Sequence, residues 1–295
     1  MLKTAASPDP AISAPSKRRP PATRRAAASA PRPFLKWAGG KRQLLPHLLA
    51  HVPERYGTYH EPFVGGGALF FAVRPRRAVL SDTNERLVRT YRGIQQDVEG
   101  VIDLLRSYPH DKAFFLDKRR EPIDARSDVE VAAWMIYLNR TGYNGLYRVN
   151  RDNQFNVPFG DYASPTLCDA ENLRACAHAL ADACIERAPF TGVTSRAQRG
   201  DFVYFDPPYV PLSTSSSFTA YTADGFGLTQ QAELRDAARE LMRRGVHVVL
   251  SNSSAPQVFA LYTPDFAVTE VMATRMVNCK AEGRGKVKEL ILHAR

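Results

Sequence analysis

The stretch Phe202-Val203-Tyr204-Phe205-Asp206-Pro207-Pro208-Tyr209 decides the fold of this chain. Its unbroken run of apolar and aromatic residues is typical of a short, fully buried strand. The prolines end the strand, because a proline ring fixes φ and carries no amide N–H for a ladder. An acidic side chain directly after such a strand lies where open α/β sheets bind ligands. The stretch therefore predicts a doubly wound sheet with a site beside Asp206.

The same turn suits the recognition of an amino group on a flat base. An exocyclic amine has two N–H donors, and the Asp206 carboxylate and the Pro207 carbonyl offer two acceptors. Tyr209 adds an aromatic face on which an extruded base could stack. The alternative is a plain turn at the end of a strand, where Asp-Pro and Pro-Pro pairs are common. Asp206, Pro207 and Tyr209 are therefore the candidate catalytic residues.

Strands and helices alternate on both sides of this stretch, as a doubly wound α/β sheet requires. Apolar runs predict further strands at His60–Phe63, Ala78–Leu80, Val246–Leu250, near Phe266–Met272 and at Val287–Leu292. Helical spacing predicts helices at Gln43–His51, near Glu171–Cys184 and at Gln230–Arg243. The expected fold class is α/β, with a Rossmann-like sheet.

Residues 86–167 interrupt this alternation and predict an inserted, mainly helical domain. Helices are expected over Glu85–Leu105, near Lys112–Arg119 and over Val129–Asn139. The turn-rich run Tyr147–Val157 predicts a β-hairpin. Residues 34–85 and 168–295 would then form the sheet domain. Residues 1–33 are rich in Ala, Pro and Arg and cannot bury enough surface to become ordered, so we expect a disordered basic tail.

A second signal is the glycine loop Glu61-Pro62-Phe63-Val64-Gly65-Gly66-Gly67, which follows a predicted strand. Glycines allow a cofactor to approach the backbone closely. Asp82 ends the next strand, where nucleoside-binding sheets place an acid that accepts from ribose hydroxyls. A phosphate-binding loop at Gly39-Gly40-Lys41 is disfavoured, because Arg42 replaces the required Ser or Thr and Leu35 replaces the first glycine. The pattern therefore indicates a nucleoside cofactor rather than ATP hydrolysis.

Net charge alone does not identify the partner. The chain carries a formal charge of +10, and residues 1–33 hold +6 of it, with seven basic groups against Asp9 alone. The remaining +4 could still steer a polyanion if those charges lie on one face. No apolar run approaches the roughly 20 residues that a membrane span requires, so no membrane partner is expected.

The four cysteines predict neither a metal site nor disulfides. Cys168, Cys176, Cys184 and Cys279 include no C-x-x-C pair, and disulfide frameworks belong to small secreted domains. Cys176 and Cys184 are eight residues apart in an alanine-rich run, a spacing that places both on one face of a helix. We expect buried structural thiols in a reducing compartment, and no metal.

Six motifs, taken in order, resemble those of Dam-type enzymes, the D12 class, alpha group, of DNA adenine-N6 methyltransferases. The resemblance runs from about Phe34 to Leu292, and the glycine loop precedes D-P-P-Y as it does in that family. The motifs are F-L-K-W-A-G-G-K at 34–41, E-P-F-V-G-G-G at 61–67, N-R-T-G-Y-N-G-L at 139–146, F-N-V-P-F-G at 155–160, D-P-P-Y at 206–209 and F-T-A-Y at 218–221.

The resemblance implies an S-adenosylmethionine-dependent enzyme that methylates N6 of adenine in double-stranded DNA, within GATC. It also implies that the adenine is flipped out of the duplex and that the methyl group is transferred directly, in line, without a metal. The block 86–167 would be the target-recognition domain. We expect a monomer in a bacterial or phage-like cytoplasm, associated with the nucleoid. Whether a cognate restriction endonuclease accompanies it stays open.

Residue by residue, the resemblance implies two sets of contacts. The cofactor would be bound near the two strand ends, by Trp37, Lys41, Phe63, Gly65, Gly67, Asp82 and Asp206. DNA would be contacted from the N-terminal motif and the hairpin region, by Lys36, Tyr143, Asn144, Leu146, Arg148, Pro158 and Tyr162. Arg148 can donate two hydrogen bonds to guanine O6 and N7, and Tyr143 can wedge into the base stack.

Simpler explanations exist for several of these residues. Leu146, Pro158 and Phe159 could belong to the core, and Lys36 could be a solvated surface lysine. Ser251-Asn252, at the end of a strand, could be a turn rather than part of the pocket. For the whole chain, the alternative functions are a cytosine-N4 or RNA adenine methyltransferase and a non-catalytic, basic DNA-binding protein.

The chain also departs from the family pattern at two places. Asp161 stands where relatives commonly have a basic residue, and an acid beside DNA repels phosphate. Within a basic loop at 275–286, Cys279 and Lys280 stand where relatives tend to have small polar residues. Contacts to phosphates from that loop are expected, and the fine specificity near Asp161 is open.

Overall fold

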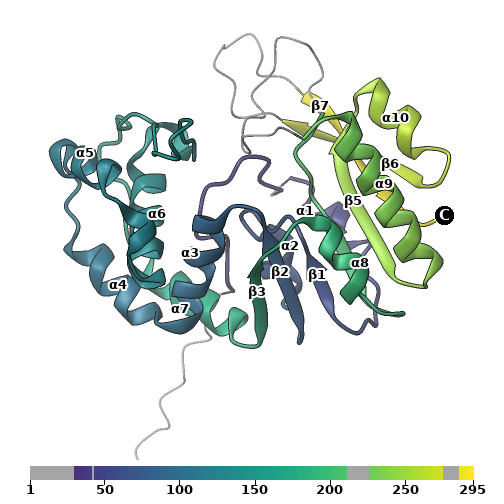
Figure 1. Ribbon diagram of the computed structural model, residues 1–295, viewed down its shortest axis with the longest axis horizontal. Coiled ribbons are helices and arrows are strands. Elements are labelled where there is room, and N and C mark those ends of the chain that lie inside the picture. Colours follow the sequence, from purple (N-terminus) through teal and green to yellow (C-terminus); the bar gives the residue numbers. More distant parts are fainter. Residues whose placement is uncertain (1–29, 42, 211–225, 275–285) are drawn as a thin grey trace, which may run out of the picture.

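A seven-stranded sheet runs through the middle of the computed structural model, which describes residues 30–41, 43–210, 226–274 and 286–295 (Figure 1). The strand order across the sheet is β3-β2-β1-β4-β5-β7-β6. The strands are β1 (Tyr59–Glu61), β2 (Ala78–Asp82), β3 (Ala183–Arg187), β4 (Phe202–Phe205), β5 (His247–Ser253), β6 (Ala267–Thr274) and β7 (Lys286–His293).

The order of the strands reverses between β1 and β4. From β1 the chain proceeds to β2 and β3 on one side, and from β4 it proceeds to β5 on the other, with all five strands parallel. β7 then inserts antiparallel between β5 and β6. Tyr59 pairs with both Ala78 and Phe202, so the carboxyl ends of β1, β2 and β4 meet at one edge. This topology confirms the doubly wound, Rossmann-like sheet and places its ligand crevice between β1 and β4.

Helices cover both faces of the sheet. The helices of the described residues are α1 (Leu45–Leu49), α2 (Ala68–Val73), α3 (Glu85–Gln96), α4 (Val98–Ser107), α5 (Lys112–Arg120), α6 (Asp128–Thr141), α7 (Ala170–Leu180), α8 (Val193–Arg196), α9 (Leu228–Arg243) and α10 (Pro256–Tyr262). Alternate residues of β4 belong to two separate cores, as the period of two in a strand dictates. Phe202 and Tyr204 share one with α2, α3 and α7, whereas Val203 and Phe205 share the other with α8, α9 and α10.

The helices α4, α5 and α6 stand beside the sheet, on the left of Figure 1. α6 begins with a capping box between Ser127 and Glu130, and its residues 131–139 are all buried. Trp134 and Phe155 belong to the same buried cluster as the α3 face of the sheet, so this block shares its core with the sheet. The helices expected near Lys112–Arg119 and over Val129–Asn139 are therefore present. The expected helix Glu85–Leu105 is instead two helices, α3 and α4, because the Asp97 side chain caps the start of α4. The limits of a separate inserted domain stay a prediction.

The expected hairpin is a tight turn rather than a pair of strands. An isolated antiparallel bridge joins Val149 to Phe155, and the Asn150 amide donates to the Gln154 carbonyl at 2.9 Å. Within the turn, Asn153 has a φ of 58°, the left-handed region that asparagine tolerates. The segment Tyr147–Val157 therefore keeps the predicted reversal of the chain without a ladder.

Two predictions near α7 are wrong. The predicted helix Glu171–Cys184 ends at Leu180, and Cys184 lies in β3, where it pairs with Val79 and is exposed. A free edge on β2 gives the segment Ala183–Arg187 backbone partners that helical spacing alone does not reveal. Cys176 is buried as expected, and burial raises the pKa of its thiol to about 12. Cys279 lies outside the described residues.

The ordered part of the chain also begins earlier than Phe34. The backbone of Arg32 exchanges two hydrogen bonds with the Asn172 side chain in α7, at 2.9 and 3.0 Å. The Arg32 carbonyl accepts from the Cys176 thiol, and its guanidinium pairs with Asp169 at 2.8 Å. Arg32 thus belongs to the folded body, while residues 1–29 of the expected tail lie outside the described residues. Within the described ranges, no helix is long and apolar enough to cross a bilayer.

Gly93 marks the closest approach between the sheet layer and the helical block. A Cβ at this position in α3 would overlap the Asp128 carbonyl oxygen and lie 3.0 Å from the Ala132 Cβ in α6. We expect Gly93→Ala to force the helices apart and to lower the free energy of unfolding by about 1–3 kcal/mol in urea denaturation. Gly192→Ala is the control, because its Cβ would meet Ala188 at an ordinary 3.9 Å. Equal stability of the two variants would contradict this packing.

Candidate functional site

Asp206 follows β4 at the reversal of strand order, as its sequence position predicts. Its Oδ1 lies 2.7 Å from Lys41 Nζ and accepts a hydrogen bond from Ser251 Oγ at 2.8 Å. Ser251, at the end of the neighbouring strand β5, is in turn 3.0 Å from the Tyr204 hydroxyl. Ser251 is therefore bonded to Asp206 from the neighbouring strand, and whether it lines a ligand pocket stays a prediction.

Lys41 is a buried cation between the N-terminal segment and β4. Its side chain is only 4% exposed, and its ammonium also donates to the Gly39 carbonyl at 2.6 Å. Burial alone would lower the pKa of Lys41, but the attraction of the Asp206 carboxylate outweighs it and the pKa is raised. Nζ lies 4.5 Å from the centre of the Tyr209 ring, within range of a cation–π contact. Lys41 therefore stays charged in the site.

The turn after β4 is braced from two neighbouring elements. The Tyr209 hydroxyl donates to Glu289 Oε2 in β7 at 3.1 Å, which sets the tilt of its ring. The Pro208 carbonyl accepts from Gln231 Nε2 at 3.1 Å, and Gln231 is itself held by the Asn252 side chain at 2.9 Å. Pro207 is buried within the turn. The sequence analysis did not predict Glu289 or Gln231, because their partners Tyr209 and Pro208 are distant in the sequence.

The glycine loop is tied to the end of β2 by Asp82. The Asp82 carboxylate accepts from the backbone amides of Gly65 at 3.3 Å and Asn84 at 2.9 Å. The Gly65 carbonyl accepts from the Tyr91 hydroxyl at 3.1 Å, and a Cβ at Gly67, whose φ is 65°, would come 2.7 Å from that hydroxyl. Burial raises the pKa of Asp82 to about 6. The loop and the acid therefore form one unit, as the sequence predicts.

Glu61 adds a buried carboxyl that the sequence did not single out. It lies at the end of β1 between the strands of Asp82 and Asp206, and it accepts from the Tyr59 hydroxyl at 2.7 Å. Burial, reinforced by the negative charge of Asp206, raises the pKa of Glu61 to about 8. Neighbouring strands are about 4.8 Å apart, so the two acids at the flanking strand ends lie roughly 10 Å from each other.

Trp37 joins the glycine loop to the hairpin region. A Cβ at Gly65 would come 2.8 Å from Trp37 Cδ1, so the indole lies directly on the loop backbone. The indole also stacks on Tyr147, with ring centres 5.5 Å apart and an angle of 23°. Phe63, by contrast, turns to the other core, where it stacks on Phe190 at 5.4 Å. Phe63 and Trp37 therefore pack against different hydrophobic cores.

The expected DNA-contacting residues gather along the segment after α6. Tyr143 is 51% exposed, and its amide donates to the carbonyl of the exposed Pro158 at 2.9 Å. Asn144, exposed beside it, has a φ of 55°. The Arg148 guanidinium is exposed and donates to the Asn156 side chain at 2.6 Å. Exposed aromatic and cationic groups thus share one edge of the molecule.

Lys36 meets this edge from the N-terminal segment. Its ammonium lies 5.0 Å from the centre of the Tyr162 ring, and its aliphatic stem packs against Gly145. The buried Asn139 joins the two segments, since its side chain bonds both backbone groups of Lys36 at 2.8 Å and the Gly145 carbonyl at 2.7 Å. Leu146 is only partly buried, packed against the core. The Lys36 backbone is therefore fixed, while its side chain is exposed and its role stays a prediction.

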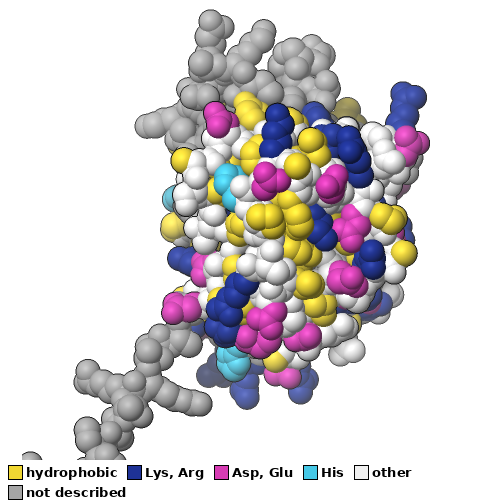
Figure 2. All heavy atoms as spheres, turned by 90° about the vertical axis from the view of Figure 1, so that its left-hand side faces the viewer, with side chains coloured by type: hydrophobic (Ala, Val, Ile, Leu, Met, Phe, Trp, Pro, Cys, Tyr) yellow, Lys and Arg dark blue, Asp and Glu magenta, His cyan; other side chains and the backbone are white. Residues whose placement is uncertain are grey.

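Two stretches of the sequence analysis lie outside the described residues. These are the F-T-A-Y motif at 218–221 and the basic loop at 275–285. On the outer face over α4 and α5, basic and acidic side chains are interspersed with hydrophobic ones (Figure 2), so the positive charge is not gathered there. The part of the chain that the structure describes contains no cluster of three or more His, Cys, Asp or Glu that could hold a metal ion.

Family membership follows from comparison with known proteins. A model of the D12 class N6 adenine-specific DNA methyltransferase family matches residues 37–277, which include the glycine loop and D-P-P-Y. The chain belongs to this family. The resemblance seen in the motifs is thereby confirmed, and S-adenosylmethionine is the methyl donor that membership implies.

Named relatives agree over nearly the whole chain. The Type II methyltransferase M1.LlaDCHI of Lactococcus lactis subsp. cremoris is 45% identical over 269 residues, covering 88% of this chain and 94% of that protein. The Type II methyltransferase M.MjaIII of Methanocaldococcus jannaschii is 37% identical, covering 86% and 95%. The DNA adenine methylase of Vibrio cholerae is 35% identical, covering 88% and 95%. The protein is therefore an adenine-specific DNA methyltransferase.

The residues at the strand ends of this D12-class enzyme fit its methyl donor. The loop backbone and the Trp37 indole touch without a side chain between them, because a Cβ at Gly65 would overlap the indole. Asp82 and Asp206, at the strand ends that flank β1, are acids of the chemical type that accepts from ribose hydroxyls or faces a positively charged sulfonium. Lys41 is a buried cation beside Asp206. These groups are compatible with a ligand that carries a nucleoside, a positive sulfur and an amino acid.

The raised pKa of Glu61 predicts a specific pH dependence of stability. The folded protein holds this proton from about pH 4.5 to about pH 8, whereas the unfolded chain loses it near pH 4.5. The stability that Glu61 contributes is therefore complete below pH 4.5 and is lost as the pH rises toward 8. We expect Glu61→Gln, which stays neutral, to remove this decline, worth a few kcal/mol at about 1.36 kcal/mol per pKa unit.

Urea denaturation across that pH range would measure the effect on the free energy of unfolding. Glu54→Gln, at an exposed position, is the matched control for the loss of one carboxylate. If the free energy of unfolding changes with pH equally in Glu61→Gln and in the parent protein, Glu61 does not hold its proton in the folded state.

Proposed function

We propose that this methyltransferase modifies N6 of adenine within GATC in duplex DNA, after the target adenine has been flipped out of the helix. The observation that carries the proposal is the position of Asp206. Its carboxylate lies at the reversal of strand order, one strand away from the Asp82-braced glycine loop. An acid fixed beside a nucleoside site can orient an amino group toward a methyl donor.

Asp206, Pro207 and Tyr209 form the proposed catalytic group. Lys41 and Ser251 both bind Asp206 Oδ1, and we assign Oδ2, together with the Pro207 carbonyl, to accept the two N–H groups of the adenine amine. Tyr209, held by Glu289, offers its ring for stacking on the flipped base. The contribution of these groups is orientation and electrostatic support of the positive charge that develops on N6.

The proposed cofactor residues are those at the ends of β1 and β2 and in the N-terminal segment, namely Trp37, Lys41, Phe63, Gly65, Gly67, Asp82 and Asp206. S-adenosylmethionine supplies a methyl group on a sulfonium, an excellent leaving group, so direct in-line transfer needs no covalent enzyme intermediate. Asp82 is oriented by the Gly65 and Asn84 amides to accept hydroxyl donors. Lys41 compensates the charge of Asp206 inside the pocket.

Residues 86–167 are proposed as the target-recognition domain, and residues 34–85 and 168–295 as the catalytic domain. We propose that the DNA sequence is recognised by the residues along the exposed edge, namely Lys36, Tyr143, Asn144, Leu146, Arg148, Pro158 and Tyr162. Its exposed guanidinium and aromatic ring suit base contact and insertion. GATC is proposed because these residues match, position by position, those that Dam-type enzymes use for that site.

Relatives support further points about the setting. Two are named Type II methyltransferases, which supports a role beside a cognate restriction endonuclease. We propose a monomer that acts in the cytoplasm on nucleoid DNA. The family and its named members act on adenine in DNA, which weighs against cytosine-N4 or RNA methylation. The intact Asp206 site weighs against a protein that only binds DNA.

Methyl transfer to duplex DNA tests the reaction and its site together. With labelled S-adenosylmethionine, we expect N6-methyladenine alone, mapped to GATC by sequencing of methylated bases. Asp206→Ala should lower the transfer rate roughly 100-fold or more, as loss of a central electrostatic group does. N4-methylcytosine, label confined to RNA, or an Asp206→Ala variant with full activity would each refute the proposal.

Arg148→Ala tests base reading separately from catalysis. Loss of a bidentate contact to guanine should cost about 1–3 kcal/mol in binding a duplex that contains the site, with little change in affinity for unrelated duplexes. Equilibrium binding at fixed salt measures both values. Arg76→Ala, at an exposed loop position away from the hairpin, is the control for loss of one positive charge. A uniform loss on all duplexes would make Arg148 a phosphate contact instead.

A further inference from the structure

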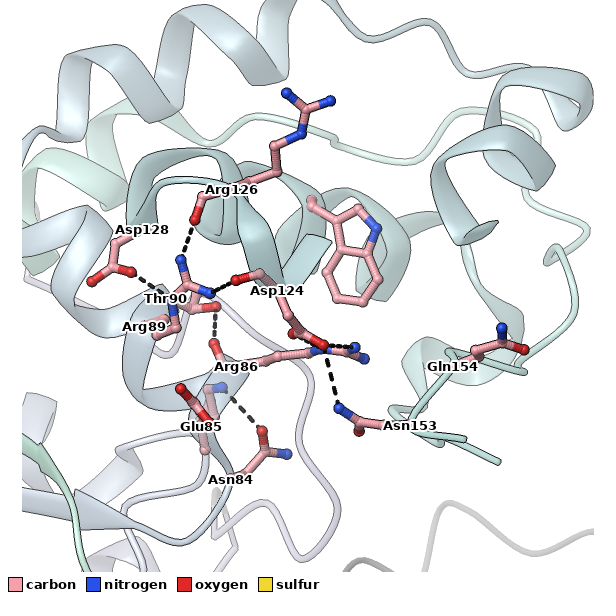
Figure 3. A network of polar contacts seen from close by, with 12 residues as sticks. Asn84, Glu85, Arg86, Arg89, Thr90, Asp124, Arg126, Asp128, Asn153 and Gln154 are labelled. Carbon is pink, nitrogen blue, oxygen red and sulfur yellow. Dashed lines mark hydrogen bonds and ion pairs between the residues drawn. The ribbon is translucent and has the colours of Figure 1, made fainter. Parts of the chain in front are cut away.

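Arg86 in α3 makes a buried, two-pronged ion pair with Asp124, at the centre of the polar network in Figure 3. Its Nε and Nη2 donate to Asp124 Oδ1 and Oδ2, both at 2.6 Å. The guanidinium lies over the Trp134 ring, 5.3 Å from its centre. The Arg86 side chain is 8% exposed and that of Asp124 57%, so the cation is held inside while its partner reaches the surface.

The pair touches the hairpin segment 147–157 at both of its ends. At the tip, Asn153 Nδ2 approaches Asp124 Oδ2 at 3.5 Å, and Figure 3 shows the Asn153 side chain directed toward the pair. At the base, the Tyr147 hydroxyl is close enough to Arg86 to be affected by its charge: burial raises the pKa of Tyr147, and Arg86 acts against that rise. Arg86 Nη1 has no hydrogen-bond partner among the described residues.

Tyr147 is connected to the glycine loop through Trp37. Its ring stacks on Trp37, and Trp37 lies against Gly65. Arg148, the proposed guanine reader, is the next residue after Tyr147. The Arg86–Asp124 pair thus meets the hairpin segment at Asn153, and Trp37 meets it at Tyr147.

We propose that the Arg86–Asp124 pair is a positioning device that holds the 147–157 hairpin at a fixed height over the cofactor loop and thereby sets how strictly the enzyme discriminates its DNA site. The proposal rests on the proposed function, in which Arg148 reads a base. Arg86 itself touches neither base nor cofactor. It acts by restraining Tyr147 and, through Asp124, Asn153.

A neighbouring arginine separates this role from simple attachment of the helices. Arg89, one turn further along α3, donates to Asp128 at 2.6 Å and to the carbonyls of Asp124 and Arg126. It therefore ties α3 to Asp128 at the start of α6, whereas Arg86 ties α3 to the turn Ile123–Ala125 (Figure 3). Among the described residues, Arg89 makes no contact with the hairpin, so its substitution weakens the attachment of α3 without removing the contact between Asp124 and Asn153.

The test compares site discrimination in Arg86→Gln, Asp124→Asn, the double variant and the control Arg89→Gln. Discrimination is kcat/KM on a duplex with the mapped site divided by kcat/KM on a duplex with its guanine base pair changed. We expect Arg86→Gln and Asp124→Asn each to lower this ratio about tenfold, which is part of the discrimination that one mismatched base pair provides. The double variant should lose no more than the larger single effect, because one device is removed.

Two further readouts separate positioning from general destabilisation. The KM for S-adenosylmethionine should change less than about twofold in every variant, and Arg89→Gln should keep the parental discrimination even where its thermal midpoint falls. Asp124 is more than half exposed, so Asp124→Asn supplies a folded variant if Arg86→Gln is unstable. Discrimination in Arg86→Gln and Asp124→Asn equal to that of Arg89→Gln would overturn the inference.

Arg148→Ala in the same assay keeps the two proposals apart. If Arg148→Ala loses discrimination while the Arg86 and Asp124 variants keep it, the positioning device is wrong and the reader is right. If Arg148→Ala itself discriminates as the parent does, the assignment of the reader fails first.

Discussion

The buried ion pair between Lys41 and Asp206 is the contact on which the rest of the site depends. Lys41 ends the N-terminal segment and Asp206 ends β4, so the pair closes a connection between parts of the chain 165 positions apart. A buried cation is tolerated only with a close counter-charge, and this one has a carboxylate at 2.7 Å and a carbonyl at 2.6 Å. The pair therefore fixes both the acid and the segment that leads to it.

The N-terminal segment 34–41 contacts both the sheet and the helical block. The Phe34 carbonyl accepts from Arg140, Lys36 is bonded on both backbone groups by Asn139, and Trp37 lies between Gly65 and Tyr147. Groups from the cofactor loop, the hairpin and the acid therefore meet on eight consecutive residues, 34–41. A continuous buried core beneath them keeps the two halves from moving independently.

The site contains several buried ionisable side chains, which protein interiors rarely contain. Glu61 and Asp82 have raised pKa values because they are buried, and Lys41 is charged in the same crevice. Such groups cost stability and cluster at functional sites, where a ligand of complementary charge offsets the cost. A nucleoside with a positive sulfur and an amino-acid end is a ligand of that kind. The acids and the cation here therefore form the kind of cluster that marks a functional site.

The amino-acid sequence by itself determined the strand Phe202–Phe205, the doubly wound class and the family, because hydrophobic period and motif order are local properties. Only the tertiary structure decided that Cys184 lies in β3 rather than in α7, since an alanine-rich segment becomes a strand when β2 offers it an edge. The same holds for Glu289 behind Tyr209 and for Arg86 with Asp124. Their partners are 80 and 38 residues away, and no local pattern encodes a contact made across the fold.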